Sequence, residues 1–154
     1  MAAVPMPALD NEPILAYKTR LGEAWAGDAL FERGFVSPDD RALYTSTDDA
    51  SAAVEEIMRF YRVYHSQRFV AGRLILRLNA MPETSALAAL SSEFADIITR
   101  GEIEPVVASP EEIRDDDAVD LPRIALWFDR MSYGRLRLLI DRLNELPVGN
   151  ATGR

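Results

Sequence analysis

The chain has 154 residues, of which 48% are hydrophobic and 27% charged, and its formal net charge is -8 at pH 7. This composition is typical of a globular chain that buries a hydrophobic core, and it excludes the compositions that stay disordered. The absence of cysteine excludes disulfides and thiolate metal sites. The negative charge disfavours nucleic-acid partners, because it repels the phosphate backbone.

No window of the sequence reaches the roughly 20 consecutive apolar residues of a membrane span. The first residues, MAAVPMPALDNEP, have neither the basic start nor the apolar run of a secretion signal. We therefore expect a cytoplasmic protein without a membrane partner, and the lack of cysteine fits that reducing compartment.

The amino-terminal part of the chain has weak patterns. Residues 1–12 contain two prolines and no periodicity, which indicates a flexible lead-in. A short strand is expected over 14–17, followed by a helix that ends at Gly34. The segment VSPDD then predicts a turn, and Thr47 or Asp48 is the candidate N-cap of the next helix.

That next helix, predicted over 50–66, is the clearest element of the sequence. Its apolar face is formed by residues at three- and four-residue steps, namely Val54, Ile57, Met58, Tyr61, Tyr64 and His65. At the end of this face, His65 is interpreted first as a partly buried core residue. Glu55 and Arg59 stand four residues apart, as an exposed helical ion pair does.

The remaining sequence predicts a strand, a helix, a strand, an acidic loop, a strand and a helix. Alternation at Leu74, Leu76 and Leu78 is typical of a strand with one buried face. The elements after it are expected over 82–101 (helix), 102–108 (strand), 109–120 (solvated acidic loop), 123–128 (strand) and 132–146 (helix).

Each of these elements has one apolar side, which predicts an α+β fold of two layers with the helices on one face of a small sheet. The order βαββα is similar to ferredoxin-like or ACT-like modules that lack an outer strand. It allows the strands at 73–79 and 102–108 to pair in parallel around their helix. We expect this α+β module to occupy 67–147, after a helical amino-terminal segment (13–66) and before a tail (148–154).

Residues that could bind a ligand concentrate where the long helix meets the first strand of the module. Arg62, His65 and Arg68 form the candidate ligand site, because guanidinium groups bind oxyanions and an imidazole titrates near neutrality. Neighbouring aromatic rings could stack on a nucleotide base. The competing interpretation, which we favour, gives these arginines surface or interface roles.

No catalytic motif is complete in the chain. It contains no GxGxxG or Walker-type phosphate loop, no GxSxG elbow and no thiol nucleophile. The single histidine excludes paired-histidine zinc motifs, and the aspartates at 115–117 lack the alternating spacing of a calcium loop. We therefore expect no catalytic residue, no metal ligand and no cofactor.

The segments VSPDD, TDD, FYRVYHSQRF and WFDR...GRLRLLIDRLN resemble the carboxyl-terminal portion of long bacterial proteins of the Lonely-Guy-type family, often labelled lysine decarboxylase-like. In that family a Rossmann-like domain hydrolyses nucleoside 5′-monophosphates to the base and ribose phosphate. The resemblance covers about residues 13–146 and implies that 13–66 is a remnant of the end of the Rossmann-like domain. The family's catalytic motif PGGxGTxxE has no counterpart in this sequence, so no catalytic residue carries over.

Three functions follow as hypotheses. The first is a non-catalytic assembly or regulatory module, with a homo-oligomer or a Rossmann-like subunit as partner. The second is an ACT-like module that binds a nucleotide or an amino acid near Arg62, His65 and Arg68. The third is part of a phosphoribohydrolase that a separate Rossmann-like subunit completes.

Overall fold

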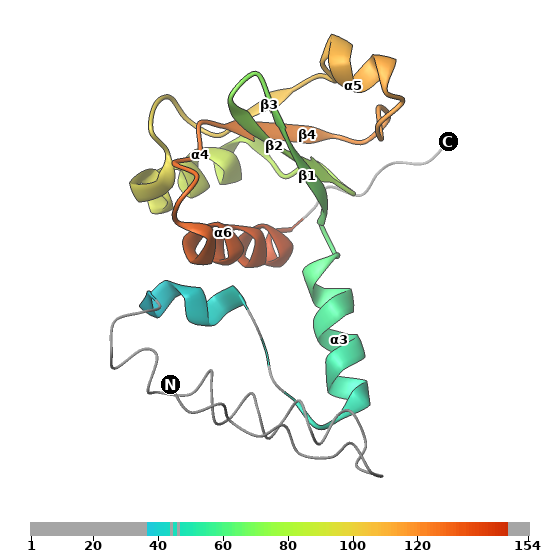
Figure 1. Ribbon diagram of the computed structural model, residues 1–154, viewed down its shortest axis with the longest axis vertical. Coiled ribbons are helices and arrows are strands. Elements are labelled where there is room, and N and C mark those ends of the chain that lie inside the picture. The colour runs from blue at the N-terminus through green and yellow to red at the C-terminus, as the bar shows by residue number, and fades with distance from the viewer. Residues whose placement is uncertain (1–36, 44, 46, 148–154) are drawn as a thin grey trace, which may run out of the picture.

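The computed structural model describes residues 37–43, 45 and 47–147. The lead-in predicted at 1–12, the strand at 14–17, the helix ending at Gly34 and the tail at 148–154 lie outside the described residues. The elements are η1 (Pro38–Leu43), α3 (Ala50–Phe60), β1 (Tyr64–Val70), β2 (Arg73–Leu78), α4 (Thr84–Glu93), η2 (Ala95–Ile97), β3 (Glu104–Val106), α5 (Pro110–Arg114), β4 (Arg123–Leu126) and α6 (Tyr133–Glu145) (Figure 1).

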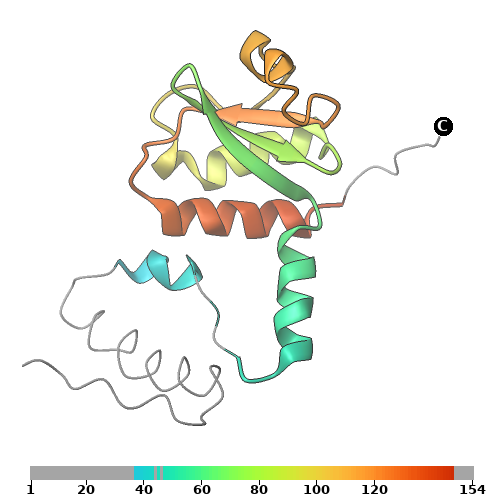
Figure 2. The same ribbon diagram turned by 45° about the vertical axis from the view of Figure 1, so that its right-hand side comes forward.

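The described residues form an α+β structure around a four-stranded antiparallel sheet, which confirms the predicted class. Helices α4 and α6 cover one face of the sheet (Figures 1 and 2). As the alternation predicts, Leu74, Leu76 and Leu78 of β2 are fully buried on that face. They pack with leucines and isoleucines of α4, α6 and β4 in one hydrophobic core.

The helix predicted over 50–66 ends at Phe60, so this prediction is wrong for its last residues. Tyr64–Val70 instead forms strand β1, which pairs antiparallel with β2 and crosses the boundary predicted between residues 66 and 67. The two strands are joined through Ala71 and Gly72, which have φ values of +48° and +86°. Positive φ at both positions is typical of a type I′ hairpin.

The N-cap of α3 is Asp49, which follows the predicted candidates Thr47 and Asp48.

The parallel pairing expected between the strands at 73–79 and 102–108 does not form. Strand β4 lies between β2 and β3, and the order of the sheet is β1-β2-β4-β3. Because β4 is antiparallel to both neighbours, β2 and β3 run in the same direction and α4 connects them as a split βαβ unit. The outer position beside β2 is filled by β1.

The break between α3 and β1 is held by one side chain of α6. The buried amide of Asn144 accepts hydrogen bonds from the backbone N–H groups of Val63 at 2.7 Å and Tyr64 at 3.1 Å. It also donates to the carbonyl of Phe60 at 2.6 Å. These bonds satisfy backbone groups that lose their helical partners where α3 stops.

Within the segment VSPDD, predicted as a turn, Pro38 begins the 3-10 helix η1, which packs on α6. A Cβ atom at Gly134 of α6 would lie 2.4 Å from the carbonyl carbon and oxygen of Asp39. The close approach of η1 therefore requires glycine at position 134.

Replacing Gly134 with alanine is expected to detach η1 from α6, because the added methyl group overlaps the backbone of Asp39. The helix α6 itself should persist, since alanine is about 1 kcal/mol more favourable than glycine in a helix interior. Hydrogen exchange followed by mass spectrometry should show faster exchange at residues 37–43 and little change in the sheet. Unchanged protection of residues 37–43 would contradict this account of the contact.

Candidate functional site

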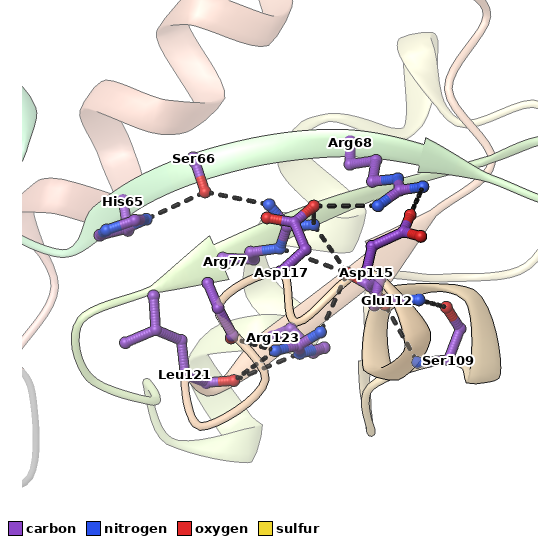
Figure 3. A network of polar contacts seen from close by, with 11 residues as sticks. His65, Ser66, Arg68, Arg77, Ser109, Glu112, Asp115, Asp117, Leu121 and Arg123 are labelled. Carbon is purple, nitrogen blue, oxygen red and sulfur yellow. Dashed lines mark hydrogen bonds and ion pairs between the residues drawn. The ribbon is translucent and has the colours of Figure 1, made fainter.

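Charged side chains gather on the sheet face opposite α4 and α6, where the short helix α5 lies (Figure 3). This helix falls within the acidic segment predicted as a solvated loop, so that prediction is wrong for residues 110–114. A capping box starts the helix: Ser109 Oγ accepts from the Glu112 N–H at 3.2 Å, and the Glu112 carboxylate accepts from the Ser109 N–H at 3.0 Å. The S-x-x-E spacing of this box is visible in the sequence.

Three buried charged side chains meet between α5 and the sheet. Glu112, Arg77 of β2 and Arg123 of β4 are each 4% exposed or less. Glu112 Oε1 accepts from Arg77 Nη2 at 3.0 Å and from Arg77 Nε at 3.2 Å. Arg123 Nη1 lies 2.9 Å from the same oxygen, close enough for an ion pair but without the alignment of a hydrogen bond. Glu112 therefore joins two adjacent strands.

The Glu112 carboxyl is held in its charged form. Burial acts to raise its pKa, but the hydrogen bond from Ser109, followed by Arg77 and the charge of Arg123, outweighs burial and holds the pKa below its ordinary value. Arg77 and Arg123 together carry one more charge than Glu112, which would leave a buried positive charge. The Asp117 carboxylate compensates part of this charge, because its Oδ2 lies 2.7 Å from Arg77 Nη2.

Arg68, one of the predicted ligand residues, belongs to the rim of this network. Its guanidinium donates to Asp117 at 3.0 Å and to Asp115 at 2.7 Å. The bond from Arg68, together with Arg77, holds the pKa of Asp117 below its ordinary value. The donors that Arg68 could offer to an external oxyanion are thus already taken by carboxylates of the chain itself. These bonds tie β1 to the segment after α5.

The other two predicted ligand residues lie elsewhere. Arg62 sits at the α3–β1 break and donates to the backbone carbonyls of Asn144 and of Leu146, the latter at 2.8 Å. His65 is exposed at the start of β1, where the pairing with β2 has a bulge, and its Nδ1 lies 2.9 Å from Ser66 Oγ. The interpretation of His65 as a partly buried core residue of the helix is wrong, because α3 ends before it and the side chain is exposed. Arg62 and Arg68 contact different elements, the end of α6 and the segment after α5.

Beside the charged network, α5 leaves part of the sheet face open. A groove of about 660 Å³ lies there, a volume within the range of small-molecule sites. Its lining is mostly apolar, and the polar residues in it are Arg73, Ser109 and Glu112. The apolar lining residues are Val70, Ala71, Ile75, Pro105, Val106 and Val107. The Arg73 guanidinium forms an ion pair with Glu104, while its Nε is buried without a hydrogen-bond partner among the described residues.

The helix α3 presents the second notable surface, which we call the α3 face: Val54, Ile57, Met58 and Tyr61. These four side chains are 51% to 70% exposed, and no residue of α3 is buried. The helix projects away from the sheet (Figures 1 and 2). The predicted apolar face therefore exists over residues 54–61, but the described residues do not cover it.

The polar side of α3 contacts α6. Arg137 of α6 forms an ion pair with Glu56 at 2.7 Å, and its guanidinium lies over the Phe60 ring at 4.5 Å. Arg59 also pairs with Glu56, instead of with Glu55 as the spacing predicts. Glu55 has no ion-pair partner in the described part of the chain. The contacts that anchor α3 thus involve its polar side, and residues 37–43, 45 and 47–147 leave its apolar face exposed.

Within residues 37–43, 45 and 47–147, no group of three or more histidine, aspartate or glutamate side chains is placed to hold a metal ion. In the same part of the chain, no helix has the length and hydropathy to cross a membrane. No protein-family model matches the chain, and no curated protein or solved structure is significantly similar to it. The resemblance to the Lonely-Guy-type family remains a prediction from the sequence patterns.

Replacing Glu112 with glutamine is expected to lower the free energy of unfolding by about 3 to 5 kcal/mol, because Arg77 and Arg123 stay buried without their shared counter-charge. Urea denaturation measures the change. The exposed neighbour Glu111 of the same helix provides the matched control, since Glu111→Gln should change stability by less than about 0.5 kcal/mol. Equal effects of the two variants would contradict the role assigned to Glu112.

The same pair of proteins tests the ionisation of Glu112. Its folded pKa lies below the ordinary 4.5, so the unfolded chain binds the proton first as the pH falls. The stabilisation by the carboxylate is present above pH 4.5 and is lost as the pH falls through the folded pKa. The stability difference between wild type and Glu112→Gln should therefore be constant above about pH 4.5 and shrink as the pH falls further.

Proposed function

We propose that this chain is a non-catalytic assembly module that contacts another protein subunit through the α3 face. The single observation that carries the proposal is that three apolar side chains of α3, and Tyr61 at its C-cap, are each more than half exposed. Methionine and aromatic residues are enriched in protein interfaces. An isolated helix of this length is marginal in water, so packing against a partner would stabilise it.

The way α3 is attached supports the same proposal. Asn144 and Arg62 hold its carboxyl end to α6, and Arg137 holds its polar side. The helix is thereby fixed in direction before any partner arrives. A preorganised surface loses less conformational entropy on association than a mobile one, which favours binding.

We also propose a finer description of the fold. A split βαβ unit, a third strand and a second helix on the same face make up most of a ferredoxin-like arrangement. We assign the outer strand of this arrangement to β1, which precedes the unit in sequence instead of following it. The module would then be a permuted relative of the ferredoxin-like or ACT-like modules expected from the sequence.

The variant Ile57→Glu tests whether the α3 face is free in the monomer. In dilute solution its free energy of unfolding should stay within about 0.5 kcal/mol of wild type, as for other surface substitutions. A covered isoleucine would respond differently, because a buried unpaired charge is strongly destabilising. Chemical denaturation at low protein concentration measures the free energy of unfolding. The variant Ile140→Glu, at a buried core position, serves as the destabilised reference. A large loss of stability in Ile57→Glu would show that the chain covers its own α3 face.

The groove on the sheet favours a second candidate function, binding of a small ligand. We propose that its occupant would be an amino acid or a nucleotide, as for an ACT-like module, with an acceptor group near Arg73. The chain alone lacks a catalytic motif, so the third hypothesis, an enzyme completed by a Rossmann-like subunit, rests on the family resemblance only.

A thermal-shift screen of amino acids and nucleoside monophosphates tests the groove. A ligand at one hundred times its dissociation constant stabilises the folded chain by about 2.7 kcal/mol, which gives a clear shift. The variant Arg73→Gln should abolish that shift, whereas Arg68→Gln should retain it. Loss of the shift in Arg68→Gln alone would instead support the site predicted at Arg62, His65 and Arg68.

A further inference from the structure

We infer that the groove beside α5 binds a carboxylic acid with an apolar body and no ammonium group, and that the carboxylate of this ligand contacts Arg73. The inference rests on the second candidate function, because it requires the groove to be a ligand site. It names the occupant as a monoanion and ranks free amino acids and nucleotides below it.

The first observation is the incomplete hydrogen bonding of Arg73. Its Nη2 donates to one carboxylate oxygen of Glu104, but its Nε is buried and has no acceptor among the described residues. A buried donor without an acceptor is unfavourable, and native structures contain few of them. The carboxylate of a ligand can accept from two N–H groups of one guanidinium. A carboxylate in the groove would therefore complete the hydrogen bonds of Arg73.

The ion pair between Arg73 and Glu104 is open to exchange. The side chain of Glu104 is 59% exposed, whereas that of Arg73 is 24% exposed. An ion pair with so exposed a carboxylate contributes little to stability, because water screens it. Glu104 lies on the edge strand β3, so a change of rotamer turns its carboxylate to solvent. Glu104 therefore competes with the carboxylate of the ligand for Arg73.

The second observation is an excess of positive charge beside the groove. The guanidinium of Arg100 lies over the Trp127 ring at 3.5 Å from its centre, and that of Arg73 lies 5.8 Å from the centre of the same ring. Within residues 37–43, 45 and 47–147, Arg100 has no ion-pair partner, and Arg73 has only Glu104. A monoanion balances the remaining positive charge, whereas the zwitterion of an amino acid does not.

The third observation is the lining of the groove, which is mostly apolar and suits a hydrocarbon body. Its one carboxylate is Glu112, which is 1% exposed and already paired with Arg77 and Arg123. An ammonium group in the groove would therefore be buried without a partner, which is unfavourable. A nucleotide fits less well, because Arg73 is the only cation among the lining residues and few polar side chains are present for a base.

Three compounds with one carbon skeleton test the inference. They are hydrocinnamate, phenylalanine, which adds an ammonium group, and hydrocinnamyl alcohol, which lacks the carboxylate. Each is titrated into the full chain at neutral pH, and two-dimensional amide NMR gives the dissociation constant. We expect hydrocinnamate to shift the amide signals of residues 70–75 and 105–109, which include the groove lining. It should bind at least about tenfold more tightly than the other two compounds.

Variants of the chain assign the binding to Arg73. Arg73→Gln should weaken the binding of hydrocinnamate at least about tenfold, the loss expected for a hydrogen bond to a charged group. Glu104→Gln should strengthen it about threefold, because the competing carboxylate is removed. This second variant keeps Arg73 and decides the question if Arg73→Gln fails to fold. Arg68→Gln, at the rim of the charged network, is the matched control and should leave the affinity unchanged.

The outcomes separate this inference from the function on which it rests. Suppose that phenylalanine binds as tightly as hydrocinnamate and that Glu104→Gln weakens it. Glu104 would then hold the ammonium group, which overturns the inference but keeps the groove as a ligand site. Binding of hydrocinnamate that Arg73→Gln does not weaken would also overturn the inference. If no acid, amino acid or nucleoside monophosphate shifts the signals of the groove, the second candidate function fails as well.

Discussion

The Asn144 side chain makes three hydrogen bonds to the backbone, two accepted and one donated, and they set the constraint on which the rest of the structure depends. They satisfy the backbone where α3 stops, and the chain can then leave the helix and enter β1 without burying unpaired polar groups. Only because the helix stops there does β1 reach the edge of the sheet and bring Arg68 to the acidic segment. The same break leaves α3 outside the core, with an apolar face that the described residues do not cover.

Charged side chains on the sheet are paired within the chain, whereas the apolar side chains of α3 are exposed among the described residues. Arginines that seemed available for a ligand neutralise carboxylates of the same chain, above all at Glu112, where burial makes an unpaired charge expensive. This network fixes α5 on the sheet and leaves the neighbouring groove open. Apolar side chains of α3, by contrast, face outward. We therefore propose association with another protein for this surface in preference to binding of a phosphate.

Much of the fold follows from local patterns. The alternation of Leu74, Leu76 and Leu78 gives β2 and its buried face, and the apolar stripe of α6 gives the last helix. The start of α5 could also have been found, because Ser109 and Glu112 have the spacing of a capping box. The hairpin was harder to predict, since Ala71-Gly72 is a weaker turn signal than Asn-Gly or Asp-Gly. Tyr64 and His65 also continue the helical spacing by coincidence.

The sequence by itself therefore determined the α+β class, the buried face of β2 and the amphipathic character of α3, because each depends on neighbours within a few residues. Tertiary structure alone decided where α3 ends, which strand lies between β2 and β3, and which charges are buried. The physical reason is that Asn144 and the partners of Glu112 are distant in the chain from the groups they satisfy. No local pattern records a hydrogen bond or an ion pair that forms only when remote segments meet.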